Sequence, residues 1–119
     1  MCFDYDGYPE FAQDRVSTAR KPHKCAACRG RIEAGEQYHY YTGKYDGHFF
    51  SDKVCRRCEY DTFRVVEHEL AEGCSWSEAW PAYSELVEYL DESGMGQTRR
   101  EDVPASFQIG DQPKIPQRA

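Results

Sequence analysis

The sequence lacks the features of an exported or membrane-spanning chain. Its first residues, MCFDYDGYPEFAQD, have neither the basic start nor the apolar run of a secretory signal. No apolar stretch approaches the length needed to cross a bilayer. We therefore expect a cytoplasmic protein without membrane contact. In a reducing compartment, paired cysteines are more often metal ligands than disulfides.

Catalytic motifs are also scarce. The sequence has no phosphate-binding glycine loop, and no serine or cysteine nucleophile accompanies a recognisable base motif. The four histidines, at positions 23, 39, 48 and 68, do not form the paired histidine motif of HNH-type nucleases. We therefore expect no enzymatic activity, and an HNH-like nuclease is the last of the alternatives considered.

What the chain does contain is aromatic residues and cysteine. Its 119 residues allow only a modest core, so a cross-link should matter for stability. The composition is 39% hydrophobic and 14% aromatic, which is too rich for a wholly disordered chain. A net charge of -6 argues against a generally basic, phosphate-coating protein but leaves room for a local basic face.

Four of the six cysteines form two C-x-x-C pairs, Cys25 with Cys28 and Cys55 with Cys58. Two residues between cysteines let one tight turn present both sulfurs to one ion, and zinc prefers four such ligands in a tetrahedron. We expect one structural Zn²⁺ per chain, because four thiolates leave no open position for a catalytic water. Its binding free energy would also be folding free energy.

Other uses of the cysteines are disulfides, redox chemistry or an iron site. No βαβ pattern surrounds either pair, which argues against a thioredoxin-like role. Cys2 and Cys74 have no partner motif. We expect Cys2 to be only a terminal residue and Cys74 to be a small packing residue. Substituting Cys74 with serine should then leave metal binding and stability nearly unchanged.

A hairpin is expected between the two cysteine pairs. Aromatic residues typical of strands occupy 36–41 and 48–53, and a loop at 42–47 separates them. The Asp46-Gly47 step in that loop favours a tight reversal.

Two helices should follow the hairpin. After Cys55, apolar residues recur three or four positions apart, and Gly73 is placed to end this first helix. A second apolar set predicts a helix from about Pro81 to Asp91, since proline is tolerated at the start of a helix.

The order of these elements resembles a treble-clef zinc finger over roughly residues 21–72. The resemblance implies that Cys25 and Cys28 lie in a zinc knuckle and that Cys55 and Cys58 lie around a helix N-terminus. The stretch ARKPHKCAACRGRIEAGEQY is also similar to small, uncharacterised zinc-finger proteins of phages and prophages. That similarity implies a phage accessory or regulatory role.

The predicted fold is therefore a small α+β treble-clef zinc finger with an additional helix. We expect an N-terminal arm at 1–20, the zinc-finger domain at 21–72, an amphipathic helix packed on it at 73–93, and a flexible tail at 94–119. The tail is assigned on its prolines, glycines and few large apolar residues.

The predicted function is a zinc-stabilised interaction module, and a protein partner is slightly favoured. Tyrosine and tryptophan give much contact area for few frozen rotors. The alternative use of these aromatic residues is to form the core. The candidates are Tyr38, Tyr40, Tyr41, Tyr45, Phe49, Phe50, Trp76 and Trp80.

Nucleic acid is the alternative partner, because residues 15–31 contain basic side chains and no acid. These cations could equally neutralise the zinc thiolates. A basic face free of carboxylates would favour nucleic acid, and an apolar patch rimmed by mixed charge would favour protein. The candidate contacts are Arg20, Lys21, Lys24, Arg29 and Arg31. Arg15, Lys44, Arg56 and Arg57 could extend this face.

Overall fold

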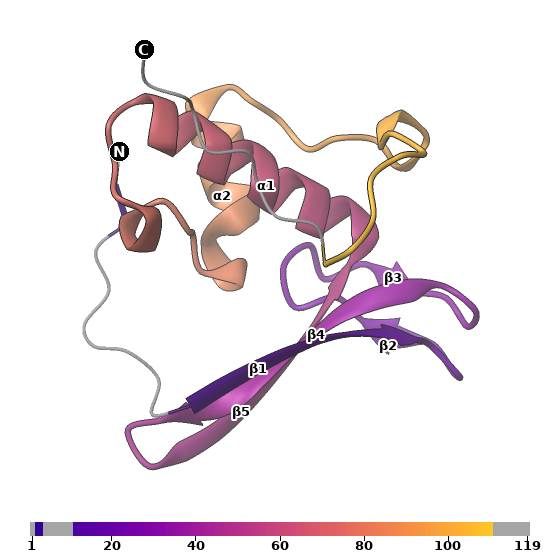
Figure 1. Ribbon diagram of the computed structural model, residues 1–119. Coiled ribbons are helices and arrows are strands. Elements are labelled where there is room, and N and C mark those ends of the chain that lie inside the picture. The colour runs from indigo at the N-terminus through magenta and orange to yellow at the C-terminus, as the bar shows by residue number, and fades with distance from the viewer. Residues whose placement is uncertain (1, 4–10, 111–119) are drawn as a thin grey trace.

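A three-stranded antiparallel sheet and two helices on one of its faces form the body of the protein (Figure 1). This computed structural model describes residues 2–3 and 11–110. The sheet has the order β1-β4-β5, and its strands are β1 (Phe11–Thr18), β4 (Gln37–Tyr45) and β5 (His48–Cys55).

A short two-stranded ribbon precedes the hairpin and carries the first cysteine pair in its turn. Its strands are β2 (His23–Lys24) and β3 (Arg31–Ile32). The amide of Ala26 in this turn donates to the carbonyl of Lys53 at a distance of 2.8 Å. The ribbon is thereby fixed to β5 near the second cysteine pair.

The predicted hairpin is confirmed, with longer strands than expected. β4 and β5 pair from Tyr38 opposite Cys55 to Tyr45 opposite His48, so only Asp46 and Gly47 remain in the turn. Their φ angles of 50° and 81° are both left-handed, as a type I′ turn requires. The expected six-residue loop is shorter because its first four residues continue the ladder.

Residues 11–18, expected in an N-terminal arm, form the edge strand β1 instead. β1 pairs with β4 over its whole length, with Asp14 opposite Tyr41 and Val16 opposite His39. Its sequence hides the strand, because apolar and polar residues do not alternate along it. Backbone pairing with β4 supplies the order that the side chains do not signal. Of the predicted arm, residues 1 and 4–10 lie outside the described ranges.

The first helix, α1 (Arg56–Ala71), follows β5 without a loop. Gly73, with φ of 107°, lies just beyond its end as predicted. The second helix is α2 (Tyr83–Ser93), two residues later than the predicted Pro81–Asp91. Pro81 lies before the helix and is buried. The side chains of Val65, Leu86 and Leu90 pack between the helices in the core and are at most 1% exposed.

Three buried carboxylates on α1 bind side chains from other parts of the chain. Glu59 reaches His39 of β4, and Glu69 accepts a hydrogen bond from the hydroxyl of Tyr89 in α2. Asp61, whose side chain is 1% exposed, pairs with Arg64 at 2.8 Å and binds Thr98. Burying a carboxylate is costly unless it is paired, so these contacts specify how the elements meet α1.

Two short 3₁₀ helices, η1 (Trp76–Glu78) and η2 (Arg100–Asp102), complete the described elements. Residues 94–110, expected to belong to a flexible tail, lie against α1 and the sheet. Arg56 donates to the carbonyls of Pro104 at 2.6 Å and Phe107 at 2.8 Å. Val103 and Ile109 are buried. The remainder of the predicted tail, 111–119, lies outside the described residues.

Cys2 and Cys74 form a disulfide, so the expectation of two unpaired residues is wrong. Their Cα atoms lie 5.6 Å apart, within the usual range for the bond. Sequence spacing could not reveal this pair, because 72 positions separate the cysteines. Across the described ranges, no helix has the length and apolar character that crossing a membrane requires.

Candidate metal centre

The four C-x-x-C cysteines meet where the ribbon, the end of β5 and the start of α1 come together. Cys25 and Cys28 lie in the β2–β3 turn. Cys55 is the last residue of β5 and the N-cap of α1, and Cys58 lies in the first helical turn. The fold therefore joins two pairs that residues 29–54 separate in sequence.

The sulfur atoms are close enough together to share one tetrahedral zinc ion. All four lie within 4.8 Å of one another, and the sulfurs of Cys28 and Cys55 are 3.9 Å apart. A zinc–sulfur bond of about 2.3 Å gives a tetrahedron with edges of about 3.8 Å. Cys25, Cys55 and Cys58 are at most 4% exposed, so the cluster is shielded from water.

Backbone amides are arranged to receive thiolate charge. The amide of Gly30 donates to the sulfur of Cys28 at 3.3 Å, and that of Cys55 donates to the sulfur of Cys25 at 3.4 Å. A side chain at Gly30 would place its Cβ 3.2 Å from the Cys28 sulfur, which is closer than nearly all real contacts. The turn is therefore shaped around the sulfur.

Either shared protons or a metal cation must balance the charge of the four sulfurs. Hydrogen bonds from its three neighbours, Cys25 foremost, lower the pKa of Cys28 far below its usual range. Hydrogen bonding to the same group of sulfurs raises the pKa of Cys58. The four sulfurs cannot all be thiolates unless a positive charge replaces the missing protons. A divalent ion meets that need, and the all-cysteine donor set favours zinc.

Arg57, which lies between Cys55 and Cys58 in the sequence, interacts with the cysteine cluster. Burial alone would lower the pKa of Arg57, but its hydrogen bond to the Cys28 sulfur and the nearby cysteine charges raise it overall. Arg56 instead binds the 104–107 backbone, and Lys24 is exposed on the ribbon. Arg57 therefore offsets part of the thiolate charge.

The candidate nucleic-acid residues from the basic stretch differ in their surroundings. Arg31 forms an ion pair with Glu33 at 3.2 Å. Arg29 lines a cleft on the helix side of the sheet. Arg20, Lys21 and Lys24 are exposed around the start of the ribbon.

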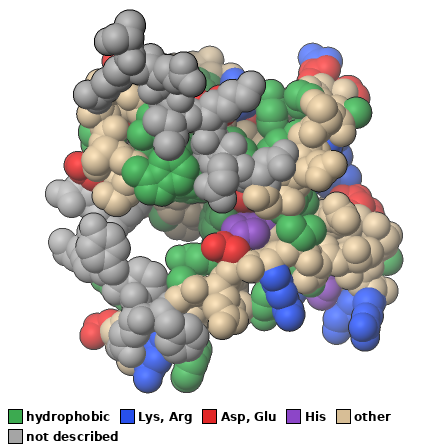
Figure 2. Space-filling model, in the orientation of Figure 1, with side chains coloured by type: hydrophobic (Ala, Val, Ile, Leu, Met, Phe, Trp, Pro, Cys, Tyr) green, Lys and Arg blue, Asp and Glu red, His purple; other side chains and the backbone are tan. Residues whose placement is uncertain are grey.

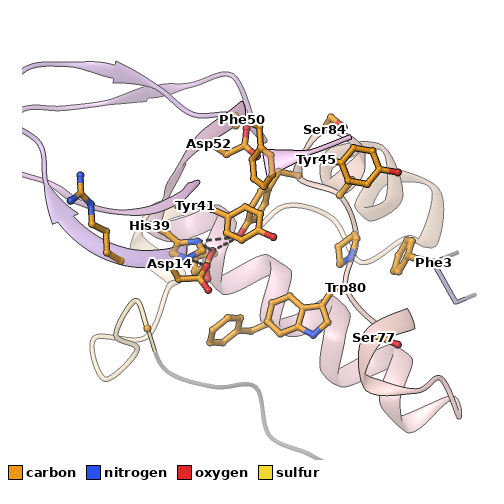
Figure 3. A pocket seen from close by; sticks show the side chains of 18 of the residues that line it. Phe3, Asp14, His39, Tyr41, Tyr45, Phe50, Asp52, Ser77, Trp80 and Ser84 are labelled. Carbon is orange, nitrogen blue, oxygen red and sulfur yellow. Dashed lines mark hydrogen bonds and ion pairs between the residues drawn. The ribbon is translucent and has the colours of Figure 1, made fainter. Parts of the chain in front are cut away.

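A cleft of about 1530 Å³ opens between the tip of the β4–β5 hairpin and residues 76–84. Figure 3 shows Tyr41 and Phe50 of the sheet on one side and Trp80 and Ser77 on the other. Several of the predicted interface aromatic residues therefore line one cavity, with Trp76 41% exposed at its rim. Tyr38, in contrast, is buried in the core.

His39, at one end of this cleft, is a site that the sequence did not reveal. Its Nε2 lies 2.8 Å from Asp14 Oδ1, and its Nδ1 lies 3.2 Å from Glu59 Oε2. The hydroxyl of Tyr83 lies 3.0 Å from the same Nδ1. Burial alone would lower the pKa of His39, but its contacts with Glu59 and Asp14 outweigh that effect and raise it. A cationic imidazole donating from both nitrogens satisfies both carboxylates.

Comparison with known proteins adds no family to these observations. Neither a protein-family model, nor a curated protein, nor a solved structure matches the chain. The geometry of the four cysteines therefore carries the functional argument, and it indicates a metal-binding module.

Proposed function

We propose that the chain is a zinc-stabilised, non-enzymatic interaction module of the treble-clef type, with one structural Zn²⁺. The observation that carries this proposal is the placement of four cysteine sulfurs within 4.8 Å of one another. The order of a turn with the first pair, a hairpin, and a helix that begins at the second pair supports the treble-clef assignment.

Zinc would join three elements that are weakly connected without it. The β2–β3 ribbon is too short to be stable alone, since each of its strands has two residues. Binding of both cysteine pairs to one ion holds this ribbon against the junction of β5 and α1. Structural zinc sites supply roughly 10–16 kcal/mol of binding free energy, which exceeds the whole stability of most small domains.

The surroundings support a role in binding rather than in catalysis. Four cysteines would fill the coordination sphere of zinc and leave no position for water or substrate. The second cysteine pair occupies the helix start, where an HNH-type nuclease would hold its catalytic metal. Both ring nitrogens of His39 are engaged by carboxylates, which argues against a general-base role for this side chain. A phage accessory role rests on the resemblance of residues 19–38 alone.

Metal analysis of two cysteine-to-serine variants tests this proposal. We expect Cys25→Ser to lose the zinc and to unfold around the ribbon. A matched control, Cys2→Ser with Cys74→Ser, removes two cysteines outside the cluster and should keep one zinc per chain. Equal zinc in the two proteins would contradict the ligand assignment, as would loss of zinc from a control whose thermal melt still shows a folded chain.

A further inference from the structure

The two faces of the sheet differ in charge. Side chains alternate along each strand, so the register assigns each residue to the helix-covered face or to the opposite, outer face. The end of the outer face at Tyr38 and Cys55 is buried at the metal centre, and the rows beyond it are less buried. Arg15 of β1, Tyr40 of β4 and Lys53 of β5 are opposite one another and form one row across the outer face. Lys44 and Phe49 belong to a second outer row near the hairpin tip.

In each row the cationic side chains lie against an aromatic ring. The guanidinium carbon of Arg15 is 4.9 Å from the centroid of the Tyr40 ring, and the Lys53 ammonium is 5.4 Å from the same centroid. In the second row, the Lys44 ammonium is 5.5 Å from the ring of Phe49, which is 76% exposed. Gln13, Thr42 and Ser51 lie between the rows.

Within residues 11–110, the carboxylates of the sheet lie on the helix-covered face or at the hairpin turn. Among the described side chains of the sheet, the outward positions hold none, and no described carboxylate pairs with Arg15 or Lys53. Asp14 and Asp52 alternate onto the opposite face, where Asp14 binds His39. The acidic helix α2 also begins on that opposite side of the sheet, because Tyr83 at its start contacts His39 and Tyr41.

The acidic side chains of α2 are therefore separated from the outer face by the thickness of the sheet. At physiological salt, charges more than about 8 Å apart are largely screened. In Figure 2, Lys and Arg side chains project along the lower edge of the molecule, where Figure 1 places the sheet. The net charge of -6 thus does not describe this surface.

We propose that the outer face of the sheet binds single-stranded nucleic acid, with phosphates held by Arg15 and Lys53 and a base stacked on the half-buried ring of Tyr40, where it takes the place of one of these two cations. Lys44 and Phe49 would extend the site toward the hairpin tip. The inference rests on the proposed function, because the zinc cluster fixes the end of β5 that carries Lys53. It names the partner class that the proposed function leaves open.

The chemistry of the face favours an unpaired strand. An aromatic ring can stack only on a base that is not already stacked in a duplex, and such stacking accepts any base. A surface for a protein partner would place apolar residues at its centre and charges at its rim. On the outer face, Arg15 and Lys53 flank Tyr40. The row between Tyr40 and Phe49 consists of polar residues. The aromatic cleft, whose lining includes Arg15 and Phe49 at its edges, remains the surface that a protein partner would use.

Only part of this face belongs to the basic set predicted from sequence. Arg15 and Lys44 are in that set, but Lys53 is not, because it lies in the second strand of the hairpin. Arg56 of the set binds the 104–107 backbone instead. Pairing of the three strands, rather than closeness in sequence, brings Arg15, Lys44 and Lys53 onto the same face of the sheet.

Binding of labelled oligonucleotides to the full chain tests the inference. Single strands of about ten nucleotides, one of deoxythymidine and one of uridine, distinguish DNA from RNA, and a DNA duplex serves as comparison. We expect salt-dependent binding of at least one single strand, and weaker binding of the duplex. Equal or tighter binding of the duplex would show that the face does not select unpaired bases.

Two pairs of variants then locate the site. Arg15→Gln with Lys53→Gln should weaken binding about tenfold and reduce the salt slope by about 1.4, since each phosphate contact contributes about 0.7. Arg99→Gln with Arg100→Gln makes the same charge change at exposed positions away from the two rows, and should alter binding less than twofold. Equal losses in the two double variants would mean that charge alone, and not this face, drives binding.

Stacking is tested with adjacent tyrosines on opposite faces. Tyr40→Leu should weaken binding roughly tenfold, whereas Tyr41→Leu should leave it unchanged. Zinc content and a thermal melt are measured on each protein. If a zinc-loaded chain with a normal melt binds neither single strand, this inference is wrong and the proposed function stands. A chain without zinc would overturn the proposed function first.

Discussion

Replacing Cys74 with serine should destabilise the protein substantially under oxidising conditions. The disulfide to Cys2 closes a loop of about 72 residues, because that is the sequence separation of the two cysteines. In the chain-entropy account, a cross-link of this length stabilises the folded state by about 4 kcal/mol. It also holds Phe3, whose amide donates to the carbonyl of Glu78 at 2.7 Å and whose ring is 5.2 Å from that of Tyr89.

Urea unfolding of three variants separates the bond from the packing of Cys74. Cys74 is buried, so its substitution could cost stability even without a disulfide, whereas Cys2 is exposed. We expect Cys2→Ser and Cys74→Ser to lower the free energy of unfolding by similar amounts. The double variant should cost no more than either single change, because both remove the same bond.

The opposite pattern would refute this reasoning. If Cys2→Ser is neutral while Cys74→Ser is destabilising, Cys74 acts only through packing. If both variants are neutral in the absence of reductant, the disulfide contributes nothing. Mass spectrometry of peptides from the unreduced wild-type protein should find the cross-linked pair directly.

Three further changes test other parts of the structure. His39→Gln should lower the free energy of unfolding most below about pH 6.5. This loss should become smaller as the pH rises through the raised pKa of folded His39. Urea titrations between about pH 6 and 9 would measure it. A cost that does not fall with rising pH would mean that the cationic form is not what stabilises the fold. Arg64→Met leaves the buried Asp61 without its cation and should cost about 3 kcal/mol, most of which Asp61→Asn in the same chain should restore. Leu86→Ala, at a fully buried position, should cost about 2–5 kcal/mol in the same assay, and a cost below 1 kcal/mol would place this residue outside the core.

The metal cluster could be predicted from sequence because its signal is local. Each C-x-x-C pair fits within one turn, and a hairpin with an Asp46-Gly47 reversal is a short-range pattern that brings the pairs together. The start of α1 was also predictable, since the apolar period changes directly after Cys55. These features depend on residues close to one another in the chain.

The features that sequence analysis missed depend on distant partners. β1 has no alternating pattern of its own and becomes a strand only by pairing with β4. Residues 94–110 have few large apolar side chains, and they are held by hydrogen bonds from Arg56 and Arg64 on α1 together with packing of Phe107 on Tyr60 and Phe63. Neither type of contact leaves a periodic signal in the segment that is held.

The buried polar cluster around His39 was missed for the same reason. Its members come from β1, β4, α1 and α2, and a lone histidine in a strand is more often a surface residue than the centre of a cluster. The division of charge between the two faces of the sheet was likewise invisible, because it depends on the register of three strands. The sequence shows which side chains are charged, and the register of the three strands shows on which face of the sheet each one lies.

The central claim is that a zinc ion bound by four cysteines holds the fold together. The most direct test is to measure the metal content of protein purified without chelator, and to record its thermal unfolding before and after a strong zinc chelator. We predict one zinc per chain and loss of the cooperative transition after chelation, because the binding free energy of such a site exceeds the stability of a small domain. A metal-free protein with an unchanged melting temperature would contradict the account.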